Sequence, residues 1–201
     1  MWPHLADLFG MRKEVTVLAP LSGKVLVLVD WDNLFFSLFN TFKQEMNLEY
    51  RLSKMMHWVK SDIGELLGGY GFVFAPDHLD IHHREMCVKN GFRMMTCPRR
   101  KLESAKRNPK TGYTVSEEDT VDETIMWFGE LMMNHSDLKC ICLVSADSDF
   151  APLFSKAKAH GIQRALVVPT INSLSASRSL IKSVSISQKD GKPMILRLDT
   201  L

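Results

Sequence analysis

Continuous apolar strands are the feature that most constrains what this chain can fold into. The segment at residues 24–30, KVLVLVD, carries five consecutive aliphatic side chains and then ends on Asp30. An unbroken apolar run, unlike an alternating one, is typical of a strand covered on both faces, as in parallel sheets. Four further segments rich in apolar residues predict strands at 71–76, 92–98, 139–145 and 164–169.

Helix-period segments separate these strands. They begin near Asn33 and otherwise cover residues 53–69, 77–91, 117–135 and 148–161. Strands that alternate with helices predict an α/β fold, here with a mainly parallel central sheet between two helical layers. The remaining expected elements are a long loop at 99–119, a helix at 173–182 and a strand at 193–198.

The expected organisation is a single domain at residues 21–186. An N-terminal extension (1–20) precedes it, and a C-terminal tail or final strand (187–201) follows it. A chain of 201 residues is long enough for one domain with a substantial core.

Composition excludes some classes of protein without selecting one. The formal net charge is only +2, from 25 basic and 23 acidic residues, so bulk charge does not indicate a nucleic-acid-binding protein. No segment approaches the roughly 20 apolar residues of a membrane span, and the N-terminal sequence lacks the pattern of a signal peptide. The four cysteines form no C-x-x-C pair, which favours reduced structural thiols. We therefore expect a cytoplasmic protein that makes no membrane contact.

Acidic residues follow two of the predicted strands and begin one helix. Asp30 ends the first predicted strand. Asp147 and Asp149, in the segment VSADSDF, follow the predicted strand at 139–145. The acidic run 117–123 begins the helix that precedes that strand. The carboxyl ends of parallel strands meet at one edge of a sheet, where ligands bind. Clustered carboxylates without His or Cys suit Mg²⁺ or Mn²⁺, which activate water toward phosphodiesters.

Each acidic position also has a purely structural interpretation. An Asp directly after a strand is often the N-cap of the next helix, which applies to Asp30 and to Asp147. The acidic run 117–123 could be the solvated start of a helix, where negative charge is favourable. These alternatives stay open from the residues alone.

Three segments in a fixed order make the pattern specific. VLVDWDNL, then TVDETI, then VSADSDFAPLFSKAKAHGIQRALVV resemble the NYN family of PIN-like ribonucleases, in particular its LabA-like branch. The resemblance covers residues 24–186. It implies a PIN-like three-layer α/β/α fold and a Mg²⁺- or Mn²⁺-dependent endoribonuclease.

The resemblance also implies roles for individual residues. The residues that match the family's catalytic, metal-binding acids are Asp30, Asp122, Asp147 and Asp149. Asn33 matches a polar residue that orients the first Asp or a phosphate, and Ser145 is expected to form a hydrogen bond within the site. One departure bears on activity, because Asp119 and Thr120 stand where the family usually has Lys-Gly.

A basic stretch within the predicted loop is the expected contact for substrate. Single-stranded or structured RNA would be drawn to it through its phosphates. The basic residues expected to bind it are Arg99, Arg100, Lys101, Lys106 and Arg107. A solvated loop without such a role is the alternative. Trp31 could stack a base, but packing in the core is favoured. PIN-like domains often pair, so a homodimer is also open.

Two rival functions remain at the level of sequence. DWDNL also resembles the nucleophile motif of haloacid-dehalogenase-like phosphatases, although Leu34 stands where those enzymes want Thr or Val. The other rival is a PIN-like module that binds RNA or protein without cleaving, for which the Asp119 departure is the main argument.

Overall fold

The computed structural model describes residues 23–43, 46–77, 79–107, 114–170, 178–187 and 189–201. The expected N-terminal extension (1–20) and the first part of the expected helix at 173–182 lie outside these residues.

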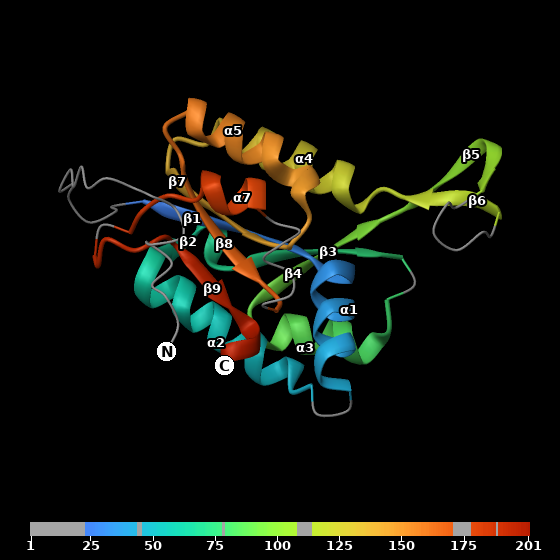
Figure 1. The fold of residues 1–201 in the computed structure, drawn as a ribbon, viewed down its shortest axis with the longest axis horizontal. Coiled ribbons are helices and arrows are strands. Elements are labelled where there is room, and N and C mark those ends of the chain that lie inside the picture. The colour runs from blue at the N-terminus through green and yellow to red at the C-terminus, as the bar shows by residue number, and fades with distance from the viewer. Residues whose placement is uncertain (1–22, 44–45, 78, 108–113, 171–177, 188) are drawn as a thin grey trace.

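A seven-stranded sheet forms the centre of the described fold (Figure 1). Its order is β4-β3-β1-β7-β8-β9, with the short β2 also paired to β1, and every pairing is parallel. The predicted α/β class with a mainly parallel sheet is thus confirmed. The strands are β1 (Lys24–Asp30), β2 (Glu65–Leu66), β3 (Gly71–Pro76), β4 (Phe92–Cys97), β7 (Leu138–Val144), β8 (Gln163–Val168) and β9 (Ile195–Arg197).

Helices cover both faces of this sheet (Figure 1). One layer holds α1 (Trp31–Phe42), α2 (Leu48–Trp58) and α3 (Ile81–Lys89), and the other holds α4 (Val121–Met132), α5 (Ala151–Ala159) and α7 (Arg178–Ser183). The short helical segments are η2 (Val59–Ile63), η3 (Leu67–Gly69), η4 (Ser148–Phe150) and η5 (Leu198–Thr200).

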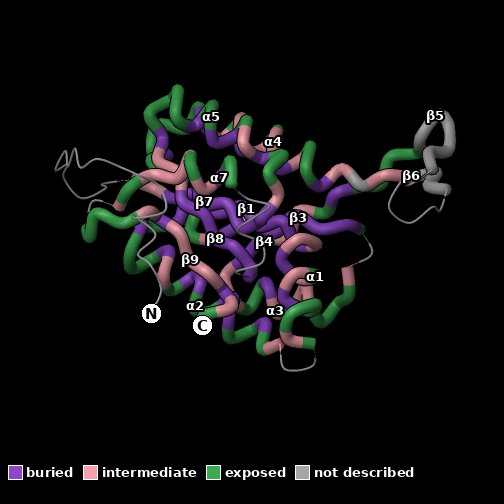
Figure 2. The backbone as a smooth tube through the Cα atoms, viewed as in Figure 1, coloured by how far each residue is buried: buried purple, intermediate pink, exposed green. Residues whose placement is uncertain are grey.

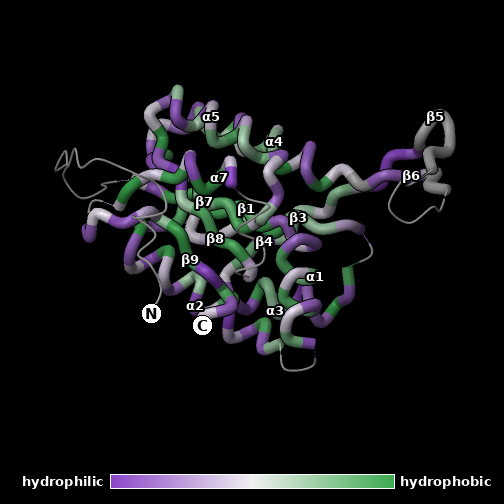
Figure 3. The backbone as a smooth tube through the Cα atoms, in the orientation of Figure 1, coloured by the Kyte–Doolittle hydropathy of each residue, from purple (hydrophilic) through white to green (hydrophobic). Residues whose placement is uncertain are grey.

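Strand β1 shows why the central run had to be apolar throughout. Val25, Val27 and Val29 point into the core beneath α1 and α2, whereas Leu26 and Leu28 point into the core beneath α4 and α5. All five side chains are buried, and the sheet appears in Figures 2 and 3 as the most buried and most hydrophobic part of the fold. A strand covered on both faces leaves no room for alternation.

The four cysteines lie in these cores as free thiols. Burial raises the pKa of Cys87 and of Cys140 to about 12, and that of Cys142 well above its usual value. The predicted reduced structural thiols are confirmed, since such groups stay protonated and unreactive.

The helix predicted at 53–69 is placed wrongly. Helix α2 begins at Leu48, because Asn47 caps it by accepting a hydrogen bond from the Tyr50 amide at 3.0 Å. The π-helical η2 ends at Ile63, with Gly64 as its C-cap, and β2 then pairs with the start of β1. The prediction takes Ser53 as the N-cap, but Asn is an N-cap as good as Ser, so the helix begins after Asn47, the earlier of the two residues.

The predicted loop at 99–119 is also wrong. Residues Arg99–Arg107 form β5 and Thr114–Asp119 form β6, an antiparallel hairpin that projects from the body of the fold (Figure 1). The predicted helix at 117–135 therefore begins only at Val121. The register sets Arg100 opposite Glu118 and Lys101 opposite Glu117, and opposite charges across a strand pair favour pairing without any apolar pattern.

Candidate active site at the carboxyl edge of the sheet

The strand order reverses direction at β1. From β1 the chain first adds β3 and β4 on one side, and later adds β7, β8 and β9 on the other. The gap between the carboxyl ends of β1 and β7 is therefore the topological switch point, the place where open α/β sheets bind ligands. The register pairs Val29 with Val144, which brings Asp30 and Ser145 side by side just beyond these ends.

Asp30 is held there by both of its carboxylate oxygens. It is the N-cap of α1, with Oδ1 accepting a hydrogen bond from the Asn33 amide at 3.2 Å. The Ser145 hydroxyl donates to Oδ2 at 3.0 Å, and the Asp147 amide donates to the Ser145 oxygen at 3.1 Å. The interpretation of Asp30 as an N-cap is thus correct, but it accounts for only one of the two carboxylate oxygens. One oxygen caps the helix while the other belongs to a chain of hydrogen bonds that joins β1 to β7.

The Asn33 side chain ties the two strand ends together. Its Oδ1 accepts a hydrogen bond from the Ala146 amide at 2.9 Å, which fixes the start of α1 against the segment after β7. Contact with Asp30 comes from the Asn33 backbone amide. The sequence prediction that Asn33 orients Asp30 therefore describes its main chain, whereas its side chain positions the neighbouring strand end.

The environment of Asp30 disfavours its charge. Only 5% of the residue is exposed, and this burial is the main cause that raises the pKa of the Asp30 carboxyl from its usual 3.8 to about 7. The negative charges of Asp122 and Asp32 raise the pKa further, against the lowering effect of the hydrogen bonds from Asn33 and Ser145. A cation beside Asp30 would favour the ionised form and reverse this effect.

The other predicted acids lie nearer the surface. Asp122 is exposed in the first turn of α4, and its negative charge raises the pKa of the Asp30 carboxyl. Asp147 caps η4 by accepting a hydrogen bond from the amide of the exposed Asp149 at 2.9 Å. The acidic run 117–123 is divided, because Glu117 and Glu118 belong to β6 and only its end belongs to the helix.

The donor types at this edge are oxygens, which suit Mg²⁺ or Mn²⁺. The buried Asp30 supplies a charge that such an ion would neutralise. Among the residues that the structure describes, no three Asp, Glu, His or Cys side chains gather closely enough to hold a metal ion. The metal site formed by Asp30, Asp122, Asp147 and Asp149 therefore stays a prediction.

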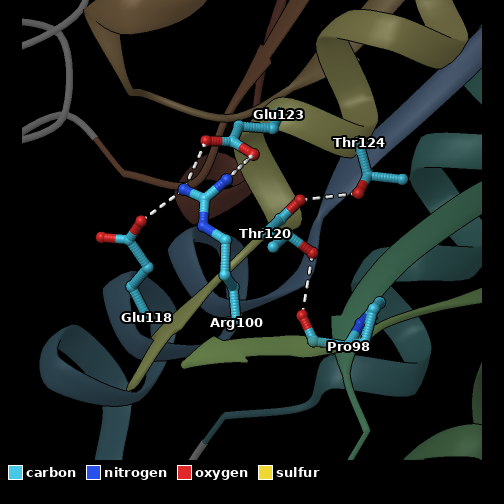
Figure 4. A network of polar contacts seen from close by, with 6 residues as sticks. All are labelled: Pro98, Arg100, Glu118, Thr120, Glu123 and Thr124. Atoms are coloured by element: carbon cyan, nitrogen blue, oxygen red, sulfur yellow. Dashed lines mark hydrogen bonds and ion pairs between the residues drawn. The ribbon is translucent and has the colours of Figure 1, made fainter. Parts of the chain in front are cut away.

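The base of the β5–β6 hairpin joins the first turn of α4 through Arg100 (Figure 4). The Arg100 guanidinium donates to the two carboxylate oxygens of Glu123 at 2.9 and 3.1 Å, and it also pairs with Glu118. Close by, the Thr120 hydroxyl donates to the Pro98 carbonyl at 2.9 Å, and the Thr124 hydroxyl donates to the Thr120 carbonyl at 2.6 Å.

These contacts bear on the prediction that the basic stretch at 99–107 binds RNA. Arg99, Arg100 and Lys101 are exposed, but each stands opposite an acidic residue of β6. The side chains of Lys106 and Arg107 lie outside the described part of the chain. Sequence reasoning missed the pairing, although three basic residues at 99–101 and three acidic ones at 117–119 were a signal for an antiparallel hairpin.

Trp31 lies beside Asp30 in sequence but is 2% exposed. It packs in the core beneath α1, as the preferred interpretation predicted, so its ring is not available to stack a base.

Comparison with known proteins gives one family. The family model described as NYN domain matches residues 24–187, which is most of the chain. No curated protein sequence matches it. Over the described residues, no helix is both long and apolar enough to cross a membrane.

Proposed function

Because this chain belongs to the NYN domain family, we propose that it is an endoribonuclease that hydrolyses RNA phosphodiester bonds with the help of Mg²⁺ or Mn²⁺. The observation that carries the proposal is the buried carboxylate of Asp30 at the switch point of the sheet, with its pKa raised to about 7. A buried acid whose charge is disfavoured, at the edge where such sheets bind ligands, is typical of a functional site.

Each acidic residue has a distinct part in this proposal. Asp30 and Asp122 are the first pair of ligands, since the negative charge of Asp122 raises the pKa of Asp30. Asp147 and Asp149 add oxygen donors from the segment that follows β7. A bound divalent ion would supply charge neutralisation and a more acidic water molecule.

Two neutral residues hold this arrangement in place. Ser145 keeps one Asp30 oxygen directed toward β7, and Asn33 fixes the segment that carries Asp147. The precision of a site depends on such supporting contacts.

The proposed substrate is RNA, drawn in part by the exposed Arg99 and Lys101 at the base of the hairpin. Lys106 and Arg107 extend the same strand away from the body of the fold. The proposal also includes a catalytic unit at residues 21–186 and a cytoplasmic location, which suits four free thiols.

Cleavage of a labelled single-stranded RNA tests the function. The wild-type protein is incubated with Mn²⁺ or Mg²⁺, beside an Asp30→Asn/Asp147→Asn double variant and a sample with EDTA. The matched control is Asp80→Asn, because Asp80 is also an N-cap, on the exposed start of α3. We expect cleavage by the wild type and by the control only. Cleavage that survives in the double variant would exclude this site.

A second candidate is a PIN-like module that binds RNA without cleaving it. The position before Val121 favours it. Thr120 stands at one of the two positions where the family usually has Lys-Gly, and it forms hydrogen bonds with Pro98 and Thr124. The module predicts RNA binding that persists in EDTA and in Asp147→Asn, with no cleavage under any condition. The family match leaves no support for the phosphatase alternative.

A further inference from the structure

We propose that the outer face of α1, formed by Phe36 and Phe39 with Lys43, is a stacking platform for single-stranded RNA that leads to Asp30. The inference rests on the proposed function in one respect, because it takes RNA as the molecule that reaches the site. It names where the bases of that RNA would lie and which side chains would hold them.

An aromatic ladder runs along α1 from the candidate site. Trp31, Phe35, Phe39 and Lys43 follow one another at intervals of four residues, so each lies above the next on the helix surface. The Trp31 and Phe35 rings are stacked with centroids 5.8 Å apart, and the Phe35 and Phe39 rings are stacked at 5.9 Å. The Lys43 ammonium lies 5.5 Å from the centroid of the Phe39 ring.

Exposure rises along this ladder. Trp31, next to Asp30, is 2% exposed, Phe35 is half-buried, and Phe39 is 42% exposed. Phe36 is 55% exposed and meets the Phe35 ring edge-on, with centroids 5.5 Å apart. His83 of α3 packs against Trp31 and Phe35 and supports the buried end. The two open rings are therefore fixed by packed neighbours, which lowers the entropic cost of stacking a base on them.

The length and charge of the ladder suit a nucleic acid strand. Phe39 lies nine residues beyond Asp30, which is about 14 Å along the helix axis. That distance corresponds to roughly four bases at 3.4 Å each. Aromatic rings can stack any base, and the Lys43 ammonium at the outer end can pair with a phosphate. The inner end is the carboxylate at which cleavage is proposed.

The exposed area argues against a second copy of the chain as the occupant. Phe36 and Phe39 together expose roughly the surface of one phenylalanine side chain, about 150–250 Å². A stable dimer interface needs about 800 Å² from each partner. Two fixed rings and a cation are too small for such an interface, yet they match the size of one or two bases and a phosphate.

Binding of fluorescein-labelled oligouridine in EDTA tests the platform without cleavage. The decisive variant is Phe36→Ala/Phe39→Ala, with Phe36→Tyr/Phe39→Tyr retaining the rings. The matched control is Trp127→Ala, because Trp127 is 62% exposed on α4, across the sheet from α1. An abasic oligomer of the same length separates stacking from phosphate contacts. Thermal unfolding verifies that all variants fold.

We expect the alanine pair to weaken oligouridine binding about tenfold or more, because it removes the rings on which the bases stack. The tyrosine pair and Trp127→Ala should bind like the wild type, and the abasic oligomer should not distinguish the variants. Equal binding by the alanine pair, equal losses for the abasic oligomer, or no binding by the wild type would overturn the proposal. So would sedimentation that shows a wild-type dimer lost in the alanine pair.

The failure of this inference can be separated from failure of the proposed function. If oligouridine binds through the two rings and no RNA is cut, the nuclease proposal fails alone. If RNA is cut and the alanine pair leaves KM unchanged, the platform fails alone.

Discussion

Charge is handled in opposite ways at the switch point of the sheet and at the base of the hairpin. At the switch point, Asp30 is buried, receives hydrogen bonds from two neutral donors, and has its pKa raised by burial and nearby acids. At the hairpin, Arg100 is exposed between two carboxylates, which raise its pKa. At the switch point the negative charge of Asp30 is disfavoured, and a bound cation would stabilise it. At the hairpin the positive charge of Arg100 is already neutralised by Glu118 and Glu123.

This difference distinguishes a region with a functional role, the switch point, from a region with a structural role, the base of the hairpin. A buried acid without an opposite charge costs folding free energy, so its presence indicates another role. An exposed set of ion pairs costs little and contributes little, which suits a part that holds the start of α4 in place. Residue type alone does not make this distinction, because both regions are rich in acidic residues.

Asp30→Asn should have the largest effect, on cleavage. We expect the rate at saturating Mn²⁺ to fall about 1,000-fold, the upper range for removing one group that stabilises charge in a transition state. Arg100→Gln should change the same rate by less than about tenfold, since it acts only on the position of α4. Single-turnover cleavage of one labelled RNA measures both. Equal losses in the two variants would remove the distinction between the regions.

The same substitution should stabilise the free protein at alkaline pH. The native pKa of Asp30 is about 7 against 3.8 when unfolded, so between these values the native state keeps a proton that the unfolded state has lost. Native stability therefore falls as pH rises through this window, and the loss persists above it. The amide introduced by Asp30→Asn cannot ionise. The free energy of unfolding of the variant should therefore exceed that of the wild type by about 2–4 kcal/mol at pH 8. The gain should nearly vanish at pH 4.

Urea unfolding at both pH values measures this gain, with Asp80→Asn as the exposed N-cap control. A gain of equal size at pH 4 and pH 8 would show that Asp30 is not the group responsible.

Asn33→Ala should have a moderate effect on stability. The substitution leaves the Ala146 amide without the acceptor it has at 2.9 Å, in a partly buried place. We expect the free energy of unfolding to fall by about 1–2 kcal/mol. Asn134→Ala is the control, because its side chain donates to the Leu131 carbonyl at an exposed place, and its free energy of unfolding should stay within about 0.5 kcal/mol of the wild type. A negligible change in Asn33→Ala would mean that the strand ends need no such link.

Arg100→Gln should have the smallest effect on stability and the strongest dependence on salt. Its guanidinium and both carboxylates are exposed, so water and ions screen them. A double-mutant cycle with Glu123→Gln at low and high salt should give a small coupling that disappears at high salt. A coupling that survives high salt, or a loss as large as that of Asn33→Ala, would contradict the screened network.

The sequence predicted the fold best where burial leaves no choice. The predicted strands at 24–30 and 71–76 match β1 and β3, because strands covered on both faces carry a continuous apolar signal. The hairpin gave no such signal, because its strands are polar and their charges match only when they are paired. The start of α2 depended on a choice between Asn47 and Ser53, two residues of similar capping strength.

The candidate site was predictable in the same uneven way. The pairing of β1 with β7 and its register place Asp30 beside Ser145, and both residues were expected at one edge of the sheet. The raised pKa was not predictable, because it depends on how deeply Asp30 is covered and on how near Asp122 lies. The role of the Asn33 side chain was not predictable either, since its partner lies 113 residues away in sequence.

The measurement that tests the central claim most directly is thermal unfolding with and without Mn²⁺ at pH 6 and pH 8. If the buried charge of Asp30 makes this edge a cation site, Mn²⁺ should raise the Tm of the wild type and of Asp80→Asn, because a ligand that binds only the native state stabilises it. The rise should be larger at pH 8, where Asp30 is ionised, and it should be lost in Asp30→Asn. No rise in the wild type, or an equal rise in Asp30→Asn, would contradict the claim.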